Sequence, residues 1–113
     1  MEEINNIHWH DCEIESVIEI PCKNMLVFNV QYPENWEKNY FLPKGIIFEE
    51  YHSQEVKEMP FEGNPTILNA VVFSEVATLF QKSGYFKVKI ETNAGNRFIV
   101  AKRVKLLNEQ VSI

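Results

Sequence analysis

Five residues near the start of the chain combine side chains that can do chemistry. The segment HWHDC, residues 8–12, surrounds Trp9 with two histidines, an aspartate and a cysteine. In an extended chain His8 and His10 share one face, at an i, i+2 spacing that can chelate a transition metal. With His52 or a carboxylate as a third ligand, this predicts a metal site and a small metal-dependent enzyme. The alternative is that Trp9 packs on a sheet and the segment only leads into a first strand.

The cysteine of this segment also raises the hypothesis of a catalytic nucleophile. A reactive thiol needs a positive, partly exposed environment that lowers its pKa, whereas Cys12 lies among Asp11, Glu13 and Glu15. We expect an inert thiol on the buried face of a strand, with Asp11 bonding backbone donors where that strand begins. The sequence lacks the motifs of serine hydrolases, phosphate loops and dinucleotide folds. A non-enzymatic role without a cofactor is therefore the preferred hypothesis.

Both cysteines are expected to be reduced. If residues 12–20 form a strand, about ten extended residues at roughly 3.3 Å each separate Cys12 from Cys22. That separation exceeds the roughly 7 Å limit for a disulfide. No apolar run reaches the length of a membrane span, and the acidic start lacks the basic and apolar regions of a secretory signal. We expect a cytoplasmic protein without membrane association.

Alternating apolar and polar residues predict one β-rich domain over residues 1–113. In residues 12–20 one face gathers the side chains expected to be buried, which are Ile14, Ser16, Ile18 and Ile20. Further strands are expected over residues 25–32, 45–52, 66–76, 85–92 and 97–107, with the first half of 53–65 as an extension. Residues 25–32 should pair back antiparallel onto 12–20. The fold class is all-β, or β-rich α+β: an antiparallel sandwich or partly closed barrel of about six strands.

Residues 65–83 leave strand and helix open. Asn64, Pro65 and Gly84 could cap, begin and end a helix, and the apolar residues between them keep helical spacing. The many β-branched residues favour a strand instead. We favour a strand over 66–76, then a connection that could contain a turn of helix, so a single helix within 65–83 remains the alternative.

Two other segments interrupt the strand pattern. Residues 33–45 contain two prolines and a glycine, so we expect a loop with at most a short edge strand. In residues 97–107 the alternation falters at Lys102, which would point inward with Phe98 and Val100. A β-bulge there would restore an inward set in the rest of the strand.

Large aromatic side chains gather in the loop expected at residues 33–45. Trp36, Tyr40 and Phe41 would either cover the core or contact a partner, and loops often carry binding residues. We take these three as the candidate surface for a protein partner. Self-association through sheet edges is a further alternative.

The charges are unevenly distributed along the chain. Residues 1–62 carry thirteen acidic and four basic residues, whereas residues 63–113 carry three acidic and seven basic residues. We expect this asymmetry to be neutralised between neighbouring strands, although a charged partner is the alternative. The net charge of −5 argues against nucleic-acid binding. The outward lysines of the last hairpin also lack outward aromatics beyond Tyr85 on which bases could stack.

Three stretches carry a resemblance: WHDCEIESVIEI, MLVFNVQY and KIETNAGNRFIVAKRVKLL. They resemble small uncharacterised bacterial families that open with a His-Asp pair entering an amphipathic strand and close with a hairpin like TNAG. Some of these families are similar to immunity proteins, which neutralise toxins of neighbouring bacteria. The resemblance covers about half of the chain, and residues 33–65 contribute nothing to it. It implies a β-rich fold and a non-catalytic, protein-binding role.

Overall fold

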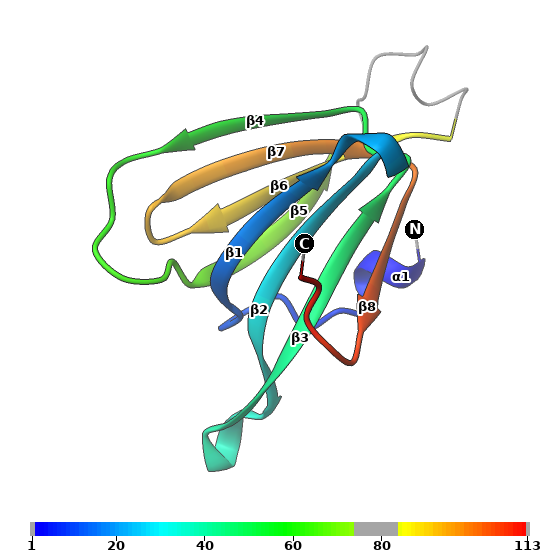
Figure 1. Cartoon of the computed structure of the whole chain (residues 1–113). Helices are drawn as coiled ribbons and strands as arrows, with labels where there is room; N and C mark the ends of the chain where they lie inside the picture. The colour runs from blue at the N-terminus through cyan, green and yellow to red at the C-terminus, as the bar shows by residue number, and fades with distance from the viewer. Residues whose placement is uncertain (1, 74–83, 113) are drawn as a thin grey trace.

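The computed structural model describes residues 2–73 and 84–112, and in these residues the chain forms two four-stranded antiparallel sheets (Figure 1). Sheet A has the order β1-β2-β3-β8, and sheet B has the order β4-β7-β6-β5. The strands of sheet A are β1 (Glu13–Ile20), β2 (Met25–Asn35), β3 (Tyr40–Glu49) and β8 (Arg103–Leu107). The strands of sheet B are β4 (Ser53–Glu58), β5 (Ile67–Phe73), β6 (Phe86–Thr92) and β7 (Gly95–Ala101). The short helices are α1 (Glu2–Asn5), η1 (Pro21–Lys23) and η2 (Trp36–Lys38).

The predicted antiparallel sandwich is confirmed, with eight strands in the described residues rather than about six. The predicted pairing of β1 with β2 is also observed, from Glu13 opposite Gln31 to Ile20 opposite Met25. The strand favoured after residue 65 is present as β5 and ends at Phe73 in the described part of the chain. The remaining part of the strand-or-helix question, residues 74–83, lies outside the described residues.

In the described residues, two features join the sheets in addition to the β3–β4 connection at residues 50–52. On one side, β1 and β5 meet at a bridge between Glu13 and Thr66, and the Ile67 N–H donates to the Cys12 carbonyl over 2.7 Å. On the other side, β7 passes directly into β8 at Lys102 (Figure 1). The bulge predicted near Lys102 is therefore wrong, because the alternation falters where the chain leaves one sheet for the other.

Two predicted strand faces are also corrected. A register shift between Ile14 and Ser16 inserts one residue into β1, so the side-chain alternation reverses there. Ile14 and Val17 contact the core, while Ser16 and Ile18 lie opposite Asn29 and Val27 on the other face of sheet A. Without the bulge, the regular alternation of the sequence would have kept Ile14 and Ile18 on one face.

In β7 the inward residues are Ile99 and Ala101, which belong to the core cluster. Phe98 and Val100, predicted to point inward, lie on the outer face of sheet B. The predicted faces of β6 are correct, because Phe86, Val88 and Ile90 are all in the core. An apolar residue at every position from Phe98 to Ala101 gives no alternation from which to choose the buried face.

Residues 33–45, expected to be a loop, instead continue the hairpin of β2 and β3. The ladder runs outward to Pro33 opposite Phe41 and Asn35 opposite Tyr40. β1 pairs with β2 only as far as Gln31, and β8 pairs with β3 only from Gly45. The prolines are tolerated there because, among the described residues, no further strand pairs beside them and needs a backbone donor.

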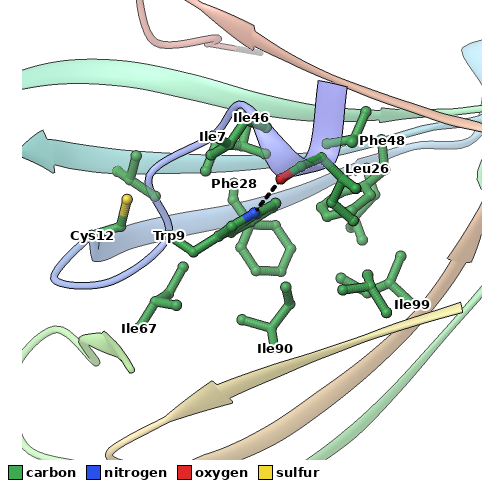
Figure 2. Close-up of a cluster of buried hydrophobic side chains, with 14 of the residues drawn as sticks. Ile7, Trp9, Cys12, Leu26, Phe28, Ile46, Phe48, Ile67, Ile90 and Ile99 are labelled. Atoms are coloured by element: carbon green, nitrogen blue, oxygen red, sulfur yellow. Dashed lines mark hydrogen bonds between the residues drawn. The ribbon is translucent and has the colours of Figure 1, made fainter. Parts of the chain in front are cut away.

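The core lies between the sheets and includes the segment before β1. Its largest fully buried side chains include Phe28, Phe48, Leu26, Ile46 and Ile90. Ile4, Ile7 and Trp9 join this cluster from the N-terminal segment, so the segment crosses one end of the sandwich and closes it (Figures 1 and 2).

Candidate functional site

The HWHDC segment forms a tight turn before β1. The Cys12 N–H donates to the Trp9 carbonyl over 3.1 Å. Asp11 has a φ of +73°, a conformation that turns accept at aspartate, asparagine and glycine. The extended geometry on which the His8 and His10 metal hypothesis was based is therefore not observed.

Trp9 anchors this turn in the core, as the architectural alternative predicted (Figure 2). It is buried, and its indole N–H donates to the carbonyl of Ile4 over 2.9 Å. Its ring stacks on that of Phe48, with centroids 6.2 Å apart. The ring contact packs the N-terminal segment on sheet A, and the hydrogen bond links Trp9 to α1 within that segment.

Cys12 is fully buried beside this tryptophan. Its thiol donates to the carbonyl of His8 over 3.1 Å. Burial, together with the smaller effect of the nearby Asp11 carboxylate, raises the pKa of Cys12 to about 12. The expected burial of this thiol is confirmed, and a buried, protonated sulfur is a poor nucleophile. Both Cys12 and Cys22 are free thiols, and Cys22 is exposed.

The three histidines do not meet in space. The Nδ1–H of His10 donates to the carbonyl of Leu68 over 2.9 Å, next to the end of β6 that holds Thr92. The ring of His52 lies against Tyr85, which precedes the first residue of β6. The length of β6, roughly 20 Å at about 3.3 Å per residue, separates these two places.

The structure therefore does not assemble the proposed site of His8, His10 and His52. Within residues 2–73 and 84–112, no group of three or more His, Cys, Asp or Glu side chains is arranged to hold a metal ion. The nearest acid to His10 is Asp11, whose carboxylate lies 3.5 Å from Nε2. The Asp11 carboxylate was expected to accept backbone N–H groups where the strand begins. Instead it is the Asp11 backbone that bonds there, because its N–H donates to the carbonyl of Ile67.

The outer part of the β2–β3 hairpin is the structure's main projecting feature, and we call residues 32–44 the arm (Figure 1). At its base the ammonium group of Lys44 lies 2.8 Å from a carboxylate oxygen of Glu34 and 4.7 Å from the ring centroid of Tyr32. The Tyr32 hydroxyl accepts the backbone N–H of His8 over 2.8 Å. The Tyr32 hydrogen bond attaches the base of the arm to the HWHDC turn, and the Lys44 contacts join the two strands at that base. This support matters because an isolated two-stranded hairpin is marginally stable.

The end of the arm carries the residues predicted to contact a partner. Tyr40 is 53% exposed, and Phe41 is half-buried. Trp36 begins the 3-10 turn that joins the two strands, and its side chain lies outside what the structure describes. Sequence reasoning found these residues from their type, but it missed the hairpin that holds them away from the sandwich.

The charge asymmetry of the chain is largely neutralised within the fold, as expected. On adjacent strands of sheet A, Glu49 pairs with Arg103 and Lys105 at 3.6 and 3.3 Å. On sheet B, the guanidinium of Arg97 donates to both carboxylate oxygens of Glu58 at 2.8 and 2.9 Å. Strands from the acidic first half thus lie beside strands from the basic second half.

The outer face of sheet B holds a second aromatic group that sequence reasoning missed. The rings of Phe73 and Phe98 stack with centroids 6.2 Å apart, and the ammonium of Lys87 lies 5.9 and 5.5 Å from their centroids. The premise that outward aromatics are missing was therefore wrong, because Phe98 was assigned to the core. Glu55 and Glu91 lie on the same face, so its bases are interrupted by the acids that phosphate binding disfavours.

Comparison with known protein families, with curated proteins and with solved structures gives no match to this chain. In the described residues, no helix has both the length and the apolar character needed to cross a membrane.

Proposed function

We propose that this chain is a non-enzymatic, cytoplasmic binding protein whose arm contacts a protein partner through Trp36, Tyr40 and Phe41. The observation that carries the proposal is the position of Tyr40, which is 53% exposed on a hairpin that extends beyond its neighbouring strands. An exposed aromatic side chain on a projecting and anchored element is the kind of residue that dominates binding energies at interfaces.

The construction of the arm favours contact through side chains. Pro33 and Pro43 lie on its two strands. Each proline removes one backbone donor that an added strand would need. We therefore expect the side chains of the arm to enter a cleft of the partner. Pairing of a partner strand with the edge of the arm is disfavoured. Lys44 and Tyr32 hold the base in place, which reduces the entropy lost when the arm binds.

An immunity-type role is the narrower form of this proposal. It is supported by the resemblance of the first two strands and the last hairpin to families that include such proteins. The partner would then be a bacterial toxin, and the arm would occupy a concave surface on it. A toxin gene adjacent to the gene for this chain would support this form, and a neighbourhood without one would count against it.

The experiment is affinity capture from the native organism with matched variants. Wild-type protein should retain a stoichiometric partner, and the double variant Tyr40→Ala, Phe41→Ala should weaken that binding by about 30-fold, as expected for hot-spot residues. Leu68→Ala is the matched control, because Leu68 is 48% exposed on β5 and lies off the arm.

Circular dichroism must first show that each variant is folded. Equal retention of the partner by the double variant and by Leu68→Ala would refute a role for the arm. A failure of the wild-type protein to retain any stoichiometric partner would contradict the proposal as a whole.

A further inference from the structure

β4 forms one edge of sheet B. In the described residues β4 pairs with β7 on one side only, and it ends the strand order β4-β7-β6-β5 (Figure 1). Val56, at the middle of this strand, is 48% exposed. Such an edge offers unpaired backbone groups to another strand.

The ladder between β4 and β7 shows which backbone groups are unpaired. The Met59 N–H donates to the Ala94 carbonyl over 2.9 Å, just beyond the pair Glu58–Gly95. In an antiparallel ladder hydrogen-bonded pairs alternate with non-hydrogen-bonded ones. Lys57 and Glu55 therefore direct their backbone groups toward β7, as Met59 does. Those of Gln54, Val56 and Glu58 point to the free edge.

The sequence of β4, SQEVKE, is complementary to itself about its valine. If a second copy pairs antiparallel with Val56 opposite Val56, then Glu55 of each copy lies opposite Lys57 of the other. Gln54 then lies opposite Glu58. The outward-pointing backbone groups coincide with this pairing, because Val56–Val56 and both Gln54–Glu58 pairs become the hydrogen-bonded ones.

The charges select this register over its neighbours. Sliding one strand by two residues keeps the hydrogen-bonding pattern but places Glu55 opposite Glu55, or Lys57 opposite Lys57 in the other direction. Like charges directly opposite destabilise a strand pair, while the Glu55–Lys57 pairs stabilise it. In the selected register they occupy non-hydrogen-bonded positions, where facing side chains lie closest.

We propose that the β4 edge is a homodimer interface, in which two chains pair about a twofold axis through Val56 and join their B sheets into one. The interface is isologous, since the same strand of each chain meets itself. It does not use the arm, so it leaves Tyr40 and Phe41 available and is independent of the proposed partner binding.

Charge reversal tests the interface and its register together. Sedimentation over a concentration series should show a monomer–dimer equilibrium for the wild-type protein. Lys57→Glu places a glutamate opposite Glu55 at both symmetric positions and should weaken the dimer by about tenfold or more. Adding Glu55→Lys to Lys57→Glu exchanges the two charges, restores both opposite-charge pairs and should return the dimer to near wild-type strength. Lys38→Glu on η2 changes the net charge equally and should leave the equilibrium unchanged.

Amide hydrogen exchange gives a readout that does not depend on substitution. As the concentration rises and dimer forms, the Val56 amide should become protected, while the Lys57 amide, already bonded to β7, should not change. A wild-type protein that remains monomeric throughout would overturn the proposal. So would a dimer that Lys57→Glu leaves intact, a double variant as weak as the single one, or a Val56 amide that stays unprotected in the dimer.

Discussion

Replacing Trp9 with phenylalanine tests whether the HWHDC segment is structural. The indole N–H donates to the carbonyl of Ile4, a residue that is 2% exposed. Phenylalanine cannot donate, so this buried acceptor would lose its partner at a cost of about 1–3 kcal/mol. The smaller ring also leaves part of the space beside Phe48 unfilled, which adds about 1 kcal/mol. The expected loss in the free energy of unfolding is about 2–4 kcal/mol, a large share of the stability of a typical domain.

Urea unfolding followed by circular dichroism measures this loss as a lower midpoint with an unchanged slope. Thermal unfolding should show a fall in Tm of roughly 10 °C or more for a chain of this size. His10→Ala in the same turn is the control, because it removes an exposed hydrogen bond and an exposed contact with Asp11 and should cost less than about 1 kcal/mol. If Trp9→Phe changed stability by no more than the His10 control, the docking of this segment in the core would be refuted.

Three further predictions rest on specific contacts. Gly95→Ala should lower the free energy of unfolding by about 2 kcal/mol or more, because Gly95 has a φ of +141° and a Cβ there would lie 2.2 Å from the Lys57 carbonyl oxygen. Urea titration measures this loss, and an unchanged midpoint would contradict the prediction. In folded protein near pH 8, a thiol reagent should modify Cys22 rapidly and Cys12 only after denaturation, and equal labelling rates would argue against the burial of Cys12. Since the folded pKa of Cys12 is raised to about 12, the protonated thiol should contribute fully to the free energy of unfolding below about pH 9, and this contribution should be lost as the pH rises toward 12. Elemental analysis of untagged protein should find no stoichiometric transition metal, because His52 lies away from the HWHDC turn; a tightly held equivalent would reverse this conclusion.

The strands with a clear period of two could be predicted from the sequence. β6 is the best case, since Phe86, Val88 and Ile90 alternate with lysines and all three are buried. The face of β1 could not be predicted beyond Ile14, because a bulge depends on pairing with β2 and leaves no mark in the alternation. The outward position of Phe98 was missed for a related reason, because it lies in an unbroken run of apolar residues.

The candidate site was predicted in its residues and missed in its geometry. The prolines in residues 33–45 predict a broken strand, which holds for a strand with neighbours on both sides. In the part of the chain that the structure describes, no strand flanks the arm, so the same prolines fit a hairpin that carries Tyr40 and Phe41 outward. The separation of His10 from His52 depends on how both are placed along β6, and no local pattern encodes that distance.

The central claim is that the arm is the partner-binding surface, and amide hydrogen exchange on the captured complex tests it most directly. Exchange should slow in residues 32–44 when the partner is added, and it should be unchanged in the HWHDC turn, where the backbone is already bonded within the fold. Unchanged exchange along the arm, with protection elsewhere on the sandwich, would contradict the claim.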